Sequence, residues 1–129
     1  MKLEIKDLWV AALRSGEYEQ TQAVLKRGDE GMCCLGVLCD IYHKTENKGE
    51  WVGGYFYDTE GGESDTELTD SVGVWASIKE NDAWVPITTR TPDIDRGFTS
   101  ERTYLAALND EGLSFSQIAD VIEHFYAEL

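Results

Sequence analysis

The apolar run "GMCCLGVLCDIY", residues 31–42, limits the possible folds of this chain more than any other stretch. From Cys34 onward, Leu38, Ile41 and Tyr42 return to one side of a helix, which is the spacing of an amphipathic segment. We therefore predict a helix over about 33–44 that contributes one face to the core. Gly36 is a weak point in this helix, because glycine is a poor helix former.

The three cysteines in this run admit a metal, a redox or a core interpretation. Cys39 and His43 would share one side of the helix, but adjacent Cys33 and Cys34 would point about 100° apart. The paired spacing of zinc knuckles and the C-x-x-C pair of dithiol enzymes are both missing. An odd number of cysteines with two adjacent does not form a disulfide framework. We interpret the thiols as buried apolar groups and expect neither metal nor cofactor.

Helical spacing recurs at both ends of the chain. Residues 3–15 show the pattern of an amphipathic helix, and Gly16 follows where a left-handed cap is expected. In the last third, Ser100 caps a helix that includes "ERTYLAALND" and ends at Gly112. A second helix starts from Ser114 or Ser116, so the two helices form a hairpin.

The middle of the chain predicts short strands. We expect a strand in "TQAVLKR" (21–27), a turn at "GDEG", and a strand or hairpin in "WVGGYFYD" (51–58). "LTDSVGVWASI" (68–78) fits a helix capped by Thr69 or a strand, and we predict the helix. "AWVPITTRTPDI" (83–94) has the alternation and prolines of an edge strand.

This order of elements predicts one α+β domain over residues 1–129, with helices packed on a small antiparallel sheet. The predicted core is formed by Trp9, Leu13, Cys34, Leu38, Ile41, Leu105, Leu108, Ile118 and Ile122.

Charge restricts the function. The chain has 25 acidic and 11 basic residues, and residues 45–83 alone hold ten acids and two bases. This surplus disfavours direct binding of nucleic acids or anionic membranes. No run of about 18 apolar residues is present, and the N-terminus lacks the pattern of a signal peptide, so we expect a cytoplasmic protein.

Catalytic patterns are weak. His43 and His124 are the only histidines, and no hydrolase, zinc-protease or phosphate-loop motif occurs. A helix-turn-helix in "LNDEGLSFSQIADVI" would need a recognition helix that the chain does not continue into. The acids of residues 58–70 do not fit a calcium loop, and we interpret them as a solvated loop. These acids are Asp58, Glu60, Glu63, Asp65, Glu67 and Asp70. We predict that the protein is not an enzyme.

Aromatic residues in the middle of the chain are more numerous than a small core readily buries. They lie near the stretch 84–102, which has three acids and three bases. Rings that stack on a base, with guanidinium groups on phosphate, would form a nucleotide site. The predicted ligand-binding residues are Trp51, Tyr55, Tyr57, Trp84, Arg90 and Arg96. The alternative is that the arginines pair with the adjacent acids Asp93, Asp95 and Glu101.

Three stretches, "LWVAALRSGEYEQ", "CCLGVLCD" and "LNDEGLSFSQIADVIE", resemble a group of small, largely uncharacterised proteins of bacteriophages and prophages. The resemblance covers about a third of the chain and brings no catalytic residues. It implies a phage origin, the cytoplasm of a bacterial host, and an accessory role such as blocking a host system.

Two functions follow as hypotheses. The preferred one is counter-defence by sequestration of a small nucleotide-derived immune signal of the host. The alternative is an acidic inhibitor whose residues 58–70 occupy a basic nucleic-acid groove of a host defence protein, with steering by opposite charge. The sequence leaves the oligomeric state open.

Overall fold

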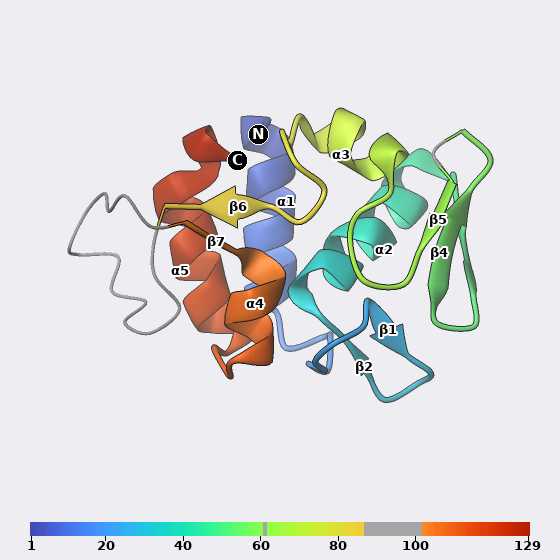
Figure 1. Ribbon diagram of the computed structural model, residues 1–129, viewed down its shortest axis with the longest axis horizontal. Helices are drawn as coiled ribbons and strands as arrows, with labels where there is room; N and C mark the ends of the chain where they lie inside the picture. The colour runs from blue at the N-terminus through green and yellow to red at the C-terminus, as the bar shows by residue number, and fades with distance from the viewer. Residues whose placement is uncertain (61, 87–101) are drawn as a thin grey trace.

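A computed structural model describes residues 1–60, 62–86 and 102–129. In chain order, its elements are α1 (Leu3–Arg14), β1 (Lys26–Arg27), β2 (Gly31–Met32), α2 (Cys34–Glu46), β3 (Glu50–Val52), β4 (Tyr55–Asp58), β5 (Gly62–Ser64), α3 (Asp70–Ala76), β6 (Trp84–Val85), β7 (Thr103–Tyr104), α4 (Leu105–Asp110), α5 (Phe115–Phe125) and the 3-10 turn η2 (Tyr126–Glu128). Helix α2 crosses the middle of the molecule, with α1, α4 and α5 on one side and the β4–β5 hairpin on the other (Figure 1).

The central helix is enclosed by the other elements. All nine residues from Cys34 to Tyr42 are buried, which confirms the predicted helix and its place in the core. Gly36 has a packing role in addition to its low helix propensity. A Cβ atom at this position would lie 2.0 Å from the carbonyl oxygen of Leu25, so only glycine allows the chain before β1 to approach so closely.

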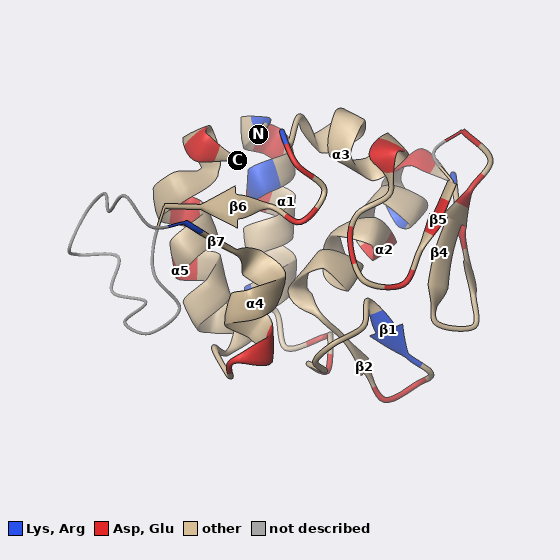
Figure 2. Ribbon diagram, viewed as in Figure 1, with Lys and Arg blue, Asp and Glu red and all other residues tan. Residues whose placement is uncertain are grey.

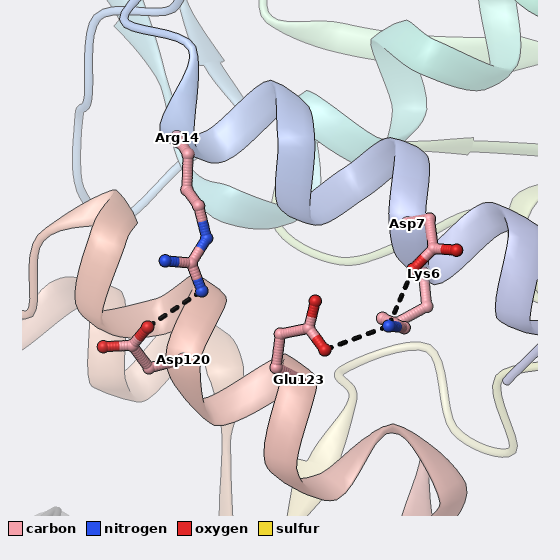
Figure 3. Close-up of polar contacts among 5 residues, drawn as sticks. All are labelled: Lys6, Asp7, Arg14, Asp120 and Glu123. Atoms are coloured by element: carbon pink, nitrogen blue, oxygen red, sulfur yellow. Dashed lines mark hydrogen bonds and ion pairs between the residues drawn. The ribbon is translucent and has the colours of Figure 1, made fainter.

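Helix α1 packs beside α5, and two ion pairs link the helices. The predicted helix over 3–15 is confirmed, and Gly16 has the left-handed φ of +78° expected after its end. Arg14 pairs with Asp120 at 2.8 Å, and Lys6 pairs with Glu123 at 3.0 Å (Figure 3). These contacts lie at the edge of an apolar interface between the two helices.

In the described part of the chain, the strands form three small antiparallel sheets, ordered β1-β2, β3-β4-β5 and β6-β7, where we expected one. The hairpin predicted in "WVGGYFYD" is confirmed, with Gly53 and Gly54 as its two-residue turn. The strand predicted over 21–27 is wrong except for Lys26–Arg27. Ala23 has a positive φ of 72°, and its N–H is held by the Asp110 carboxylate at 2.8 Å, so the chain bends there.

The C-terminal hairpin of α4 and α5 is confirmed. Ser114 caps α5 in a reciprocal capping box with Gln117. The predicted start of the preceding helix is wrong, because Thr103–Tyr104 pair with Trp84–Val85 and α4 begins only at Leu105. The predicted cap, Ser100, lies outside the described residues, as does most of the edge strand predicted over 83–94. Helix α3 follows Thr69, as predicted, but the Thr69 hydroxyl contacts the Ser71 hydroxyl at 2.9 Å and does not cap a backbone N–H of the helix.

All of the predicted core residues are buried, and they belong to one cluster. A buried polar side chain, Asn109, ties this cluster to the loop before β1. Its Oδ1 accepts from Gln20 Nε2 at 2.9 Å and from the Cys34 N–H at 3.2 Å, and its Nδ2 donates to the Thr21 carbonyl at 2.7 Å. Among the described residues, none of the helices has the length and apolar character needed to span a bilayer.

Candidate functional site

The β3-β4-β5 sheet has two faces of different chemistry, and strand register assigns the side chains to them. Trp51 is paired with Phe56, and both lie on the inner face toward α2. Tyr55 and Tyr57 flank Phe56 on β4, so they point to the outer face. Phe56 is buried and both tyrosines are exposed, as this alternation requires.

The inner face is tied to α2 through the buried carboxylate of Asp40. Its oxygens accept from Tyr18 Oη at 2.7 Å, Lys44 Nζ at 2.8 Å and Trp51 Nε1 at 3.1 Å. Burial alone would raise the pKa of Asp40, but the three donors outweigh it and lower this pKa below its usual value. The indole of Trp51 therefore holds the sheet on the helix.

A second buried carboxylate, Asp58, closes the end of β4. Tyr42 Oη donates to it at 2.6 Å, and the Glu60 N–H donates to it at 3.0 Å. The Tyr42 hydrogen bond is the main reason that the pKa of Asp58 is lowered. Burial, followed by this same bond, raises the pKa of Tyr42 to about 12. Asp58 is therefore a structural residue, although we predicted it as part of a solvated acidic loop.

The outer face combines aromatic rings with acids. The register places Glu50 and Glu63 on either side of Tyr57, across β3 and β5, and places Val52 beside Tyr55. Val52 is 55% exposed, Tyr55 47% and Tyr57 37%. These five residues are called the outer sheet face below.

Two shallow depressions lie near the sheet, and the first of them is lined partly by residues of this face. One, of about 260 Å³, is lined by Glu50, Tyr57, Glu60 and their neighbours, including Asp58. The other, of about 330 Å³, lies between the end of α2 and α3 and is lined by Tyr42, Glu46, Ser71, Val74 and Trp75 among others. Lys48 and Glu60 line both depressions. Among the residues that line them, Lys48 is the single basic one. The local charge is negative.

The acids after β4 differ in their surroundings. Glu60, Glu63 and Glu67 are exposed, whereas Asp70 accepts from Asn81 Nδ2 at 2.7 Å at the start of α3. In Figure 2, acidic residues are numerous on the strands and connections between β4 and α3, whereas basic residues are spread over several elements, including α1, β1 and α2. Asp65 is half-buried, so the three exposed glutamates are the acids of the predicted 58–70 stretch that are most available to a partner.

The predicted nucleotide site is not brought together by the described residues. Trp84 lies on β6, at the opposite end of the molecule from β4 (Figure 1). Its ring contacts Tyr104 and lies under the Arg102 guanidinium, each at 5.3 Å. Trp51 points inward, and Tyr55 and Tyr57 point outward. Arg90 and Arg96 lie outside the described residues.

The cysteines have the environment of core residues, as predicted. All three are buried, and burial raises the pKa of each thiol, so the thiolate that binds metals or attacks disulfides is disfavoured. His43 Nδ1 contacts the Gly49 carbonyl at 2.8 Å, at the turn into β3. No group of three or more histidine, cysteine or acidic side chains in the described part of the chain could hold a metal ion.

A family model for a domain of unknown function, DUF8296, matches residues 1–126. The chain belongs to this family. No curated protein and no solved structure matches it. The family description names no activity, so the resemblance of this DUF8296 chain to phage proteins stays a prediction.

Sequence reasoning missed Glu50 and misplaced Trp51. Both errors come from treating the aromatic residues of "WVGGYFYD" as one set. A Gly-Gly pair between two alternating runs is a hairpin signal, and a hairpin register separates the residues into two faces. Applied to this stretch of the DUF8296 chain, that rule would have separated inward Trp51 and Phe56 from outward Tyr55 and Tyr57.

Proposed function

We propose that this protein is a non-enzymatic binding protein whose acidic sheet side engages a basic surface of a partner protein. The observation that carries the proposal is the outer sheet face, where exposed aromatic and apolar side chains lie among acids. Exposed aromatic residues are enriched in the centres of protein interfaces. Acids around them would steer a basic partner and exclude an acidic one.

The resemblance to phage proteins supports a biological setting for this binding. An acidic protein that covers a basic groove would block access of nucleic acid to a host protein, which is a counter-defence role. The partner proposed here is a nucleic-acid-binding protein of the bacterial host. No chemical step is required of the phage protein itself.

A pull-down from bacterial lysate tests this function. Glu60, Glu63 and Glu67 are replaced by glutamine in one variant. The control variant carries Glu4→Gln, Glu17→Gln and Glu111→Gln, which remove the same charge from exposed positions elsewhere. We expect a recovered partner that is lost with the first variant, is kept with the control, and is released by double-stranded DNA. Equal recovery by both variants would refute the proposal.

A second candidate function is sequestration of a small nucleotide-derived signal. One observation favours it: the Arg102 guanidinium lies over the Trp84 ring at 5.3 Å, so a cation and a stacking ring are adjacent. Calorimetric titration with cyclic dinucleotides and cyclic ADP-ribose isomers tests this candidate. We expect binding that Trp84→Ala abolishes, with the nucleotide recovered intact after heat release. Turnover of the nucleotide would instead refute the non-enzymatic assignment.

A further inference from the structure

The arrangement of Glu50, Tyr57 and Glu63 has the chemistry of a receptor for a cationic side chain. They form one cross-strand row, because Tyr57 is paired with Glu50 on β3 and with Glu63 on β5. Directly paired residues lie about 4.5–5.5 Å apart at Cβ. A guanidinium group placed on the Tyr57 ring would therefore reach a carboxylate on either side, combining a cation–π contact with charge-assisted hydrogen bonds.

These side chains are not used to hold the fold together. Within the described part of the chain, no hydrogen bond, ion pair or ring contact involves the side chain of Glu50, Tyr57 or Glu63. Some acids elsewhere in the protein are paired within the fold, such as Asp120 with Arg14 and Asp40 with Lys44. The row thus keeps its negative charge and its exposed ring for a partner.

An apolar row lies next to this charged row. Val52 and Tyr55 are directly paired, and Tyr55 is two residues before Tyr57 on the same face of β4. Two residues along a strand span about 7 Å. The outer sheet face therefore presents a cation site and an apolar site about 7 Å apart, and both are exposed.

We infer that the outer sheet face binds an extended basic segment of the partner protein, with an arginine on the Glu50–Tyr57–Glu63 row and an apolar side chain on Val52 and Tyr55. The two partner residues are two apart in sequence, because alternate residues of an extended segment share one face. This inference rests on the proposed function and specifies which surface and which partner chemistry that function uses. Charge complementarity selects a basic segment over a second copy of this acidic chain.

Two synthetic peptides of identical composition test the inference. In the first, arginine and leucine alternate with threonine, as in Arg-Thr-Leu-Thr-Arg, so that they share a face. In the second, each arginine is adjacent to a leucine, which puts them on opposite faces. The peptides are titrated into isotopically labelled full-length protein while amide chemical shifts are recorded. We expect the chemical-shift changes to centre on the amides of β3 and β4. We also expect the first peptide to bind several-fold more tightly than the second.

Variants then assign the contacts. We expect Tyr57→Ala to weaken binding of the first peptide about tenfold, and Glu50→Gln to weaken it several-fold. Tyr104→Ala is the matched control, because Tyr104 is also 37% exposed but lies on β7. Glu111→Gln controls for the loss of one exposed acid. Both controls should bind as the unmodified protein does, and circular dichroism should show that all four variants are folded.

Several results would overturn the inference. These are shifts centred on another surface, equal affinity for the two peptides, or an unchanged affinity of Tyr57→Ala. Shifts of the β3 and β4 amides on dilution of the free protein would also overturn it, since a second copy would then cover the face. If the pull-down still depends on Glu60, Glu63 and Glu67, the proposed function survives such a failure. If that dependence is absent as well, both fail.

Discussion

Acidic residues have different roles on the helical side of the molecule, formed by α1, α4 and α5, and on the sheet side, formed by β3, β4, β5 and α3. On the helical side, Asp120 and Glu123 of α5 each pair with a base of α1. On the sheet side, Asp58 is buried in hydrogen bonds, whereas Glu63 and Glu67 are exposed without such partners. The net charge of −14 therefore does not locate a binding surface. Exposed acids such as Glu4 and Glu111 also occur on the helical side, so the location rests on the outer sheet face, where Glu50 and Glu63 flank an exposed tyrosine ring.

The largest effect is expected where the two sides meet, at Gly36 of α2. Gly36→Ala would place a methyl group 2.0 Å from the Leu25 carbonyl oxygen, which is backbone and cannot rotate away. We expect a loss of about 3 kcal/mol or more in the free energy of unfolding, measured by urea denaturation. Gly16→Ala is the control, because no atom lies within 4 Å of its added Cβ and only its φ of +78° is unfavourable. A similar small loss for both variants would contradict the packing role of Gly36.

The second-largest effect is expected for Asn109 of α4, on the helical side. Asn109→Ala removes an acceptor from Gln20 and Cys34 and a donor to Thr21, and leaves the buried Cys34 N–H and the half-buried Thr21 carbonyl unpaired. We expect destabilisation by about 3 kcal/mol and faster amide hydrogen exchange in the loop before β1. Unchanged exchange in that loop would show that Asn109 does not hold it.

A smaller, pH-dependent effect on stability is expected for the Tyr42–Asp58 hydrogen bond, on the sheet side. Tyr42→Phe removes the hydroxyl that donates to Asp58, and we expect a loss of about 1.5 kcal/mol at pH 7. The pKa of Asp58 is lower in the folded protein than its unfolded value of about 4. The stabilisation from this bond is therefore present above pH 4 and is lost as the pH falls through the folded pKa.

Urea denaturation of Tyr42→Phe at pH 7 and pH 3 measures this difference. The difference in the free energy of unfolding between the variant and the unmodified protein should be smaller at pH 3 than at pH 7. Tyr126→Phe is the control, because in the described part of the chain no acid accepts from its hydroxyl, and it should change stability little at either pH. A gap that stays constant with pH would contradict the role given to Asp58.

The smallest effect is expected for an exposed ion pair of the helical side. Arg14 and Asp120 are 42% and 51% exposed at their side chains, and their contact is screened by water and salt. We expect Arg14→Gln to change the free energy of unfolding by less than about 0.5 kcal/mol, and less still at 1 M salt. A loss that persists at 1 M salt would show that the packing of the arginine stem matters more than its charge.

Much of the fold was predictable from local patterns. The helical spacing around Trp9, the apolar run from Cys34 and the Ser114 capping box each depend on residues within a few positions of one another. The "WVGG" and "YFYD" halves of the β3–β4 hairpin are likewise neighbours in sequence. Such signals predicted α1, α2, α5 and this hairpin, and with them the composition of the core.

The failures share a different origin. The bend at Ala23 depends on Asp110, which is 87 residues away. The start of α4 at Leu105 depends on pairing of Thr103–Tyr104 with Trp84–Val85, so that residues with a helical pattern form a strand instead. Neither partner is visible in a window of local sequence.

The sequence by itself determined the helices, the composition of the core and the acidic character of the middle of the chain, because periodicity and charge are properties of neighbouring residues. Only the tertiary structure decided the roles of individual polar and aromatic groups. Asp58 and Glu63 belong to the same acidic stretch, yet Tyr42 buries one while the register leaves the other at the surface. The physical reason is that burial and pairing are set by contacts between distant segments, which residue type does not encode.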